Sequence, residues 1–173
     1  GLAGVLAAAK IGAKKIIAID VNPEKFALAK KLGATDCINP KDFDKPIQQV
    51  IIEMTEGWGV DYAVECVGNV ELMKASLEMV IKGWGKAIIV GVATGKTIDG
   101  VKSFYYVSGR SMTGAAYGNV KPSELPALVD DIVKGEINLD DFITNSRPMA
   151  EINEAFDDMH AGKTIRTIIN MWE

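Results

Sequence analysis

The amino-acid sequence predicts an α/β fold, a doubly wound parallel sheet with helices on both faces. Apolar β-branched runs alternate with amphipathic stretches through most of the 173 residues, which is typical of consecutive strand and helix units. The strand-like runs are apolar throughout, as expected where helices cover both faces of a sheet. The length is that of one ordinary domain, enough to bury about two-thirds of the unfolded chain's surface.

The first units follow from helix signals and strand patterns between residues 2 and 67. A helix is expected over Leu2–Ile11. Asn22 can cap, and Pro23 can open, a second helix that ends before Gly33, because these residue types favour helix starts and stops. The other elements expected here are the strands Lys15–Asp20, Ala34–Ile38 and Asp61–Val67, the helix Pro23–Lys31, and a helix from Asp42 or Asp44 to about Thr55.

The regular series closes with a helix over Val70–Ile81 and a strand over Lys86–Val92. Residues 93–121 are richer in Gly, Ser and Thr and contain the aromatic cluster Phe104–Tyr106, a texture typical of connecting and contact surfaces. The elements expected after Val92 are the strands Ser111–Tyr117, Phe142–Thr144 and Thr164–Met171 and the helices Pro122–Lys134 and Met149–Met159.

Composition excludes several classes of protein. The formal net charge of −4 opposes the electrostatic attraction on which nucleic-acid binding depends. No apolar run approaches the roughly 18 residues of a membrane span, so no membrane insertion is expected. The two cysteines, Cys37 and Cys66, stand alone in apolar stretches. Isolated thiols fit a reducing compartment, and we expect a cytoplasmic protein.

Asp20 is the first candidate for a functional residue because it ends a buried apolar strand. Ligands of doubly wound sheets bind beyond the carboxyl ends of the strands. A carboxylate there can accept hydrogen bonds from both ribose hydroxyls of NAD, and it repels the 2′-phosphate of NADP. A solvated or helix-capping aspartate is the alternative.

The glycines before Asp20 do not form a complete phosphate-binding fingerprint. Gly1, Gly4 and Gly12 do not fit G-x-G-x-x-G. The spacing to Asp20 fits if Gly1 is the last glycine of that turn, which places the turn and the first strand of the sheet upstream. Alternatively, Gly1 is only a terminal residue. Since the chain starts in mid-pattern without Met, we expect a processed protein or a fragment of Rossmann type that lacks its first strand.

Several short segments along essentially the whole chain have a recognisable order of residues. They are 16–26 (IIAIDVNPEKF), 32–40 (LGATDCINP), 59–68 (GVDYAVECVG), 83–85 (GWG), 88–92 (IIVGV), 108–111 (SGRS), 114–118 (GAAYG) and 165–167 (IRT). These segments resemble zinc-dependent alcohol dehydrogenases of the medium-chain dehydrogenase/reductase superfamily. Within that family, Gly68-Asn69-Val70 and Gly83-Trp84-Gly85 are most similar to class III, the glutathione-dependent formaldehyde dehydrogenases.

This resemblance implies a cofactor site for NAD. The resemblance implies that Gly1 is the last glycine of the pyrophosphate-binding turn and that Asp20 and Lys25 lie at the adenosine ribose. It also implies that Arg166 contacts the pyrophosphate. The segments that it places at the nicotinamide carboxamide are Val90, Gly91 and Val92, and Ala115, Ala116 and Tyr117. An Arg fork suits phosphate oxygens, and backbone groups can orient a carboxamide. The residues alone also allow other roles. Lys25 could lie on a solvated helix face, and Val90–Val92 could be a simple buried strand. Arg166 could cap the Met149–Met159 helix or pair with Asp157.

The zinc chemistry of the family cannot be assembled from this chain. Catalytic zinc needs Cys, His or carboxylate ligands around an open position, whereas the chain has two isolated cysteines and His160, a helix C-terminal residue. The resemblance implies that zinc belongs to the parent protein, where it polarises an alcohol or hydroxymethyl-thioether substrate before hydride passes to NAD. We therefore expect no catalytic residue, no metal ligand and no activity in this chain by itself.

The sequence also predicts how the chain is divided into domains and how it assembles. Residues 1–144 are expected to form an N-terminally truncated NAD-binding domain, and 145–173 a helix and strand that return toward the catalytic domain. The resemblance implies a homodimer paired through Thr97–Arg110. The alternative to a dehydrogenase's cofactor half is a non-catalytic dinucleotide-binding module.

Overall fold

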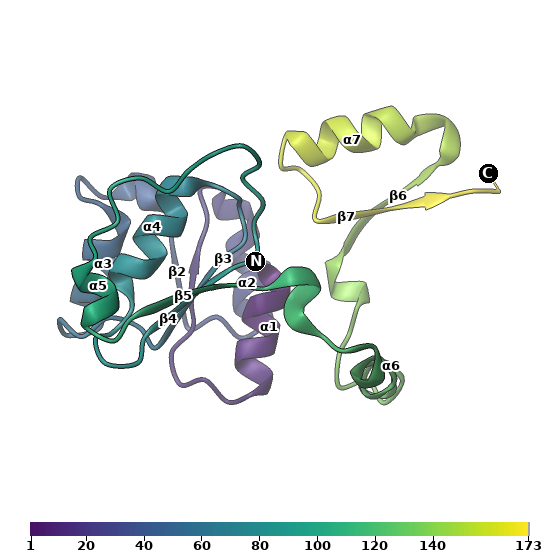
Figure 1. The fold of residues 1–173 in the computed structure, drawn as a ribbon. Helices are drawn as coiled ribbons and strands as arrows, with labels where there is room; N and C mark the ends of the chain where they lie inside the picture. The colour runs from purple at the N-terminus through teal and green to yellow at the C-terminus, as the bar shows by residue number, and fades with distance from the viewer. Residues whose placement is uncertain (173) are drawn as a thin grey trace. The chain divides into compact units, whose positions relative to one another are not determined.

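Strands and helices alternate along the chain as the pattern predicts (Figure 1). The structure is a computed structural model that describes residues 1–172, with the side chain of Tyr117 outside the described part. It divides into two units, Gly1–Asn119 and the residues from Val120 onward. Each unit is described by itself.

The first unit contains five helices and five strands, joined by short 3-10 turns. The helices are α1 (Leu2–Lys10), α2 (Phe26–Lys31), α3 (Ile47–Met54), α4 (Val70–Met79) and α5 (Phe104–Val107). The strands are β1 (Ile17–Ile19), β2 (Asp36–Ile38), β3 (Tyr62–Glu65), β4 (Lys86–Ile89) and β5 (Ser111–Gly114), and the turns are η1 (Pro23–Lys25), η2 (Pro40–Asp42) and η3 (Ala116–Asn119).

All strand pairs of this unit are parallel. β1 pairs with β2, and β4 lies between β3 and β5 in a second sheet. Among the described residues β1 and β3 do not pair, so each sheet has an open edge. The doubly wound order 3-2-1-4-5-6 puts the first strand of the sheet at this position. The α/β fold with parallel strands is therefore confirmed, in the form expected without that strand.

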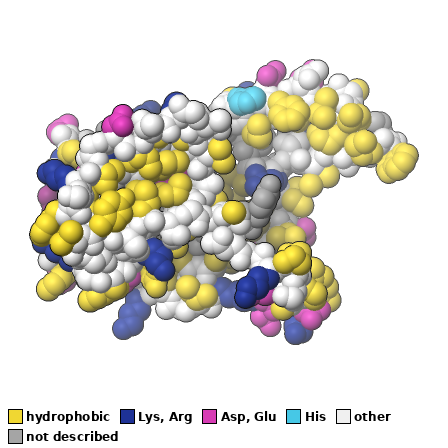
Figure 2. Space-filling view, viewed as in Figure 1, with side chains coloured by type: hydrophobic (Ala, Val, Ile, Leu, Met, Phe, Trp, Pro, Cys, Tyr) yellow, Lys and Arg dark blue, Asp and Glu magenta, His cyan; other side chains and the backbone are white. Residues whose placement is uncertain are grey.

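The larger core lies where α3 and α4 cover β3 and β4. Leu77, Val80 and Ala87 are completely buried, and Ile51 is almost so. Each fully buried large aliphatic side chain stabilises the fold by roughly 1.5–3 kcal/mol relative to its exposed state. Hydrophobic side chains also reach the surface on the side of this unit where α4 lies (Figure 2). The core thus anchors β3 and β4, whose ends carry several candidate site residues.

Helix α3 starts later than the sequence predicts. Expected from Asp42 or Asp44, it begins at Ile47 after Pro46. Two features delay it: Asn39 caps the separate turn η2 by accepting the amide hydrogen of Lys41, and a residue before proline disfavours helical backbone. The expectation was therefore wrong by three to five residues.

Strands β4 and β5 are shorter than expected. β4 ends at Ile89 instead of Val92, because the amides of Val90 and Gly91 both turn to the carbonyl of Glu65. β5 ends at Gly114 instead of Tyr117, where the chain enters η3. Both segments leave the sheet at its carboxyl edge.

The second unit holds a strand, a helix and a returning strand after a separate helix. β6 pairs with β7 in parallel. The expected short strand Phe142–Thr144 is instead the six-residue β6, since it extends along β7. The elements are η4 (Pro122–Glu124), α6 (Leu125–Val133), η5 (Asp140–Phe142), β6 (Ile143–Pro148), η6 (Met149–Glu151), α7 (Ile152–His160) and β7 (Arg166–Asn170).

A cluster of ion pairs ties α7 to the end of β6. Arg147 contacts Glu151 at 2.7 Å and Asp158 at 2.5 Å, and Lys163 reaches Asp158 at 3.3 Å. The hydrogen bonds from Arg147 and then Lys163 hold the pKa of Asp158 below its usual value of 3.8.

This cluster makes α7 sensitive to acid. Because the folded-state pKa of Asp158 is depressed, its contribution is complete above the usual pKa and is lost as the pH falls through the folded value. We expect amide exchange in α7, corrected for intrinsic rates, to accelerate in that window. Asp158→Asn should exchange faster at neutral pH and lose this pH dependence. An unchanged acid response in Asp158→Asn would contradict the assignment.

Candidate cofactor-binding site

Asp20 stands directly beyond the carboxyl end of β1. Its amide donates to the carbonyl of Ile38 at 3.2 Å, which holds it beside β2. Its Oδ1 accepts the amide hydrogen of Asn22 at 2.9 Å, while the Asn22 side chain accepts from Glu24 and caps η1. The helix cap is thus Asn22, and Asp20 orders the turn and keeps part of its carboxylate in solvent.

Lys25 lies next to this carboxylate. Its Nζ is 3.4 Å from Asp20 Oδ2, and the two side chains are 30% and 35% exposed. An ion pair of this exposure contributes little to stability, but it places a cation and an anion side by side at an accessible strand end. The structure therefore brings together the two residues that the resemblance assigns to one ribose.

The ends of β3, β4 and β5 form a second group of candidates. Val90 donates to the carbonyl of Glu65 at 2.8 Å, and Ala115 donates to Ile89 at 3.0 Å. These bonds place the segments at 90–92 and 115–116 beyond one edge of one sheet. Val90 is 44% exposed and Val92 80%, so the alternative of a simple buried strand over these residues is wrong.

Two glycines let the loops after β3 and β4 meet. Gly68 has φ +84°, and a Cβ added there would lie 2.3 Å from the Val92 carbonyl oxygen. A Cβ at Gly91 would lie 2.1 Å from the Gly68 nitrogen. Neither backbone contact can relax by moving a side chain, so both positions require glycine.

Glu65 was not among the site residues predicted from the sequence. It is 4% exposed, and Oε1 accepts amide hydrogens from Val67 and Gly68 at 2.9 Å and from Asn69 at 3.4 Å. The sequence did contain one indication of its importance, because Glu65 is a carboxylate in an otherwise apolar strand. Buried acids are rare unless they have partners. Its side chain organises the turn between β3 and α4.

Three further predicted site residues belong to other elements. Gly1 is exposed at the start of α1, where its carbonyl accepts from Val5. Arg166 belongs to β7 in the second unit, and its guanidinium donates to the carbonyl of Ile165 at 3.1 Å. The backbone of Tyr117 lies in η3, but its side chain is outside the described part.

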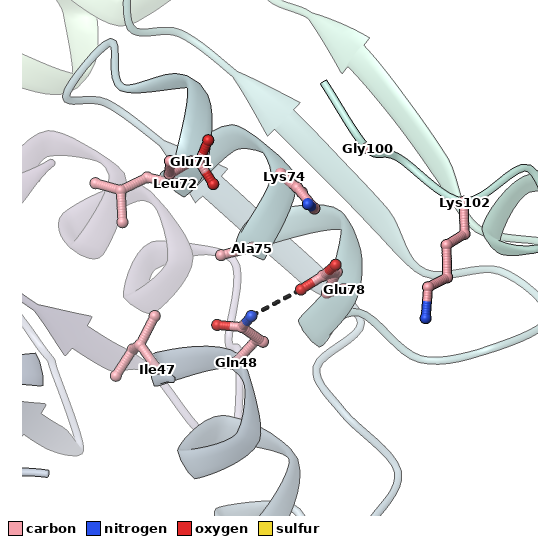
Figure 3. A pocket seen from close by; sticks show the side chains of 9 residues that line it. All are labelled: Ile47, Gln48, Glu71, Leu72, Lys74, Ala75, Glu78, Gly100 and Lys102. Atoms are coloured by element: carbon pink, nitrogen blue, oxygen red, sulfur yellow. Dashed lines mark hydrogen bonds between the residues drawn. The ribbon is translucent and has the colours of Figure 1, made fainter. Parts of the chain in front are cut away.

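A surface hollow of about 490 Å³ lies elsewhere in the first unit (Figure 3). It runs along α3 and α4, where Gln48 donates to Glu78 at 2.7 Å. None of the predicted cofactor residues lines it. Its lining consists of Ile47, Gln48, Glu71, Leu72, Lys74, Ala75, Glu78, Gly100 and Lys102.

Residues 1–172 contain neither a cluster of metal-binding side chains nor a helix able to span a membrane. This range holds no group of three or more His, Cys, Asp and Glu placed to bind a metal ion, so its side chains do not fit a zinc site. Cys37 and Cys66 are free thiols, and burial raises the pKa of Cys37. No helix in the same range has the length and apolar character needed to cross a bilayer.

The parallel strands define the class of the first unit as doubly wound α/β, a class in which ligands bind beyond the carboxyl ends of the strands. The family model described as zinc-binding dehydrogenase matches residues 1–134. The chain therefore belongs to the zinc-binding dehydrogenase family.

Relatives of known name support this membership. The chain is 53% identical over 171 residues to S-(hydroxymethyl)glutathione dehydrogenase of Synechocystis sp., and 52% identical over 172 residues to the protein of that name from Photobacterium damsela. These matches cover 98% of this chain and 46% of each relative, so the chain spans about half their length. The resemblance to zinc-dependent alcohol dehydrogenases, class III in particular, is confirmed.

Solved structures show the same fold. Benzyl alcohol dehydrogenase from Acinetobacter calcoaceticus matches with a TM-score of 0.89 at 32% identity, over 99% of this chain and 46% of that one. A zinc-binding-domain alcohol dehydrogenase from Burkholderia ambifaria matches with a TM-score of 0.88 at 30% identity, with the same coverage.

The close contact between Gly68 and Gly91 gives a test of the site's architecture. Gly91→Ala should lower the free energy of unfolding by about 1–3 kcal/mol or more, as overpacking against rigid backbone does. Gly114→Ala is the matched control, because a Cβ there meets nothing within 4 Å. Urea unfolding of the full-length protein measures both. Equal unfolding midpoints for the two variants would contradict the contact.

Proposed function

We propose that this chain is the cofactor-binding portion of an NAD-dependent, zinc-dependent alcohol dehydrogenase that oxidises an alcohol or S-(hydroxymethyl)glutathione. The observation that carries the proposal is Asp20, whose partly exposed carboxylate lies at the carboxyl end of β1. The names of the closely matching relatives support the substrate class. The parent protein, and not this chain alone, would carry out the reaction.

The residues present fit a dinucleotide. Asp20 would accept hydrogen bonds from the ribose diol, with Lys25 beside it, while backbone groups of Val90, Gly91 and Val92 orient the carboxamide. Gly68 and Gly91 leave room for the loops to meet without a side chain between them. When bound, NAD supplies a hydride acceptor; the role of this chain is to bind the cofactor and orient it.

The remaining cofactor contacts are proposals of the same kind. Gly1 would end the pyrophosphate turn, Arg166 would contact the pyrophosphate, and Ala115, Ala116 and Tyr117 would meet the nicotinamide from the end of β5. No metal step is assigned to these residues, because the described side chains do not form a zinc site. Zinc would be bound elsewhere in the parent protein.

The domain limits and the compartment also belong to this proposal. We assign residues 1–144 to the cofactor domain and 145–173 to a segment that returns to the catalytic domain. This limit falls inside β6 (Ile143–Pro148), whereas the two compact units divide between Asn119 and Val120. The free thiols Cys37 and Cys66 support a reducing, cytoplasmic location.

Cofactor preference tests the role of Asp20. In the full-length enzyme kcat/KM should favour NAD over NADP, and Asp20→Gly should narrow that ratio about 10- to 100-fold, as loss of hydrogen bonds to a charged group implies. Asp44→Gly, at an exposed acid, is the control and should leave the ratio unchanged. Equal use of both cofactors by the unmutated enzyme would sink the proposal.

The segment Thr97–Arg110 would pair two copies of the parent in an isologous contact. Phe104 is 65% exposed, Tyr106 50% and Val107 80%, which leaves an apolar surface for a partner to bury. We expect sedimentation of the full-length protein to show a homodimer. Val107→Asp should favour the monomer, whereas Val133→Asp, at an equally exposed valine, should not. A monomeric wild type at micromolar concentration would contradict this assembly.

A further inference from the structure

Glu65 is a buried acid at the end of an otherwise apolar strand. It ends β3 and points, like Ala63, to the buried side of the strand. Apolar residues fill the core beside it, and burying a carboxylate there is costly unless its hydrogen bonds compensate. The hydrogen bonds of Glu65 therefore decide what this buried carboxylate does.

The side chain of Glu65 fixes the turn that follows it. Oε1 accepts three consecutive amide hydrogens, from Val67, Gly68 and Asn69. Bonds from several backbone amides to one carboxylate oxygen are charge-assisted and therefore strong. Asn69 then caps α4 by accepting from Glu71 and Leu72. The carboxylate thus sets the backbone path from β3 to the start of α4.

The main chain of Glu65 fixes the neighbouring loop. Its carbonyl accepts from Val90 at 2.8 Å and Gly91 at 3.1 Å. The two loops then touch, since Gly68 packs on the backbone of Val92. A shift of the 67–69 turn therefore cannot leave the backbone at residues 90–92 in place.

The second carboxylate oxygen of Glu65, Oε2, lies next to Gly91, where the loops after β3 and β4 meet. Glu65 Oε2 is buried and has no hydrogen-bond partner among the described residues. It faces Gly91 so closely that a Cβ there would lie 2.6 Å from it. Most buried polar atoms have a hydrogen-bond partner, so hydrogen bonding does not explain the place of this oxygen. The carboxylate therefore supports the 91 loop sterically with one oxygen and holds the 67–69 turn with the other.

We propose that Glu65 is a positioning residue that sets the backbone of Val90–Val92 for the nicotinamide end of the cofactor, without touching the cofactor itself. This inference rests on the proposed function, because it assumes that those residues meet the carboxamide. The adenosine end is separate, since Asp20 directly follows β1, which belongs to the other sheet, and Lys25 lies in the turn η1 that comes after it. Disturbing Glu65 should therefore affect the two ends of NAD unequally.

The test compares two ligands on the full-length protein. NAD and ADP-ribose share the adenosine, pyrophosphate and second ribose, and only NAD carries the nicotinamide. Calorimetry of Glu65→Ala should show the ratio of the NAD Kd to the ADP-ribose Kd rising at least about threefold over wild type. Exchange of the Val67, Gly68 and Asn69 amides should accelerate about tenfold or more, because their acceptor is lost.

Two further substitutions at Glu65 distinguish loss of the hydrogen-bond acceptor from a general loss of folding. Glu65→Gln keeps an acceptor oxygen at the same reach and should restore the ligand ratio to near wild type. Glu65→Asp keeps the charge but shortens the side chain, so it should behave like Glu65→Ala and serves in its place if that variant does not fold. Glu71→Ala, at an exposed acid on α4, is the matched control and should leave both affinities unchanged.

The outcomes are distinguishable. An unequal loss that Glu65→Gln rescues supports the positioning role. An equal loss of NAD and ADP-ribose in Glu65→Ala and Glu65→Asp, or no loss in either, overturns it. If the wild-type protein binds neither ligand, the proposed NAD function fails, and the positioning role fails with it. If the wild-type protein binds NAD but the variants leave the ratio of the NAD Kd to the ADP-ribose Kd unchanged, only the positioning role fails.

Discussion

The packing of α4 on β3 and β4 is the constraint on which the rest of the first unit depends. Leu77, Val80 and Ala87 have no exposed surface, so the helix and the two strands keep one fixed relation. Hydrophobic burial of this kind is non-directional, and it sets the distance between the elements but not the paths of their loops. Those paths are decided by polar groups and glycines at the carboxyl ends of the strands, which is where the candidate site lies.

The site therefore combines a rigid base with narrowly determined loops. The strand ends at Glu65 and Ile89 are fixed by the core beneath them, and the loops beyond can approach each other only because Gly68 and Gly91 lack a side chain. A cofactor site built this way is preorganised, since the backbone groups that would meet the ligand are already held by hydrogen bonds. Asp20 is held in the same manner by the amide of Asn22.

Among the described residues, β1 and β3 each leave one strand edge unpaired. An unpaired strand edge leaves backbone donors and acceptors without partners, and the side chains of Tyr62 and Val64 on β3 are 65% and 50% exposed. The chain covers 46% of its curated relatives. The doubly wound order has one further parallel strand at this position, which would pair with both edges.

The sequence by itself determined the alternation of strands and helices, the cap at Asn22 and the place of Asp20 at a strand end, because periodicity, capping and strand ends are local properties of the chain. It did not determine the start of α3, where Pro46 and the Asn39 turn override the helical pattern, or the early end of β4. Only the tertiary structure showed that Glu65 holds the 67–69 turn and that Gly68 meets residues 91 and 92. The Gly68 contacts join segments more than twenty residues apart, and the Glu65 contacts, although local in sequence, require a side chain buried by the packing of the sheet. No pattern along the chain encodes how helices and strands pack.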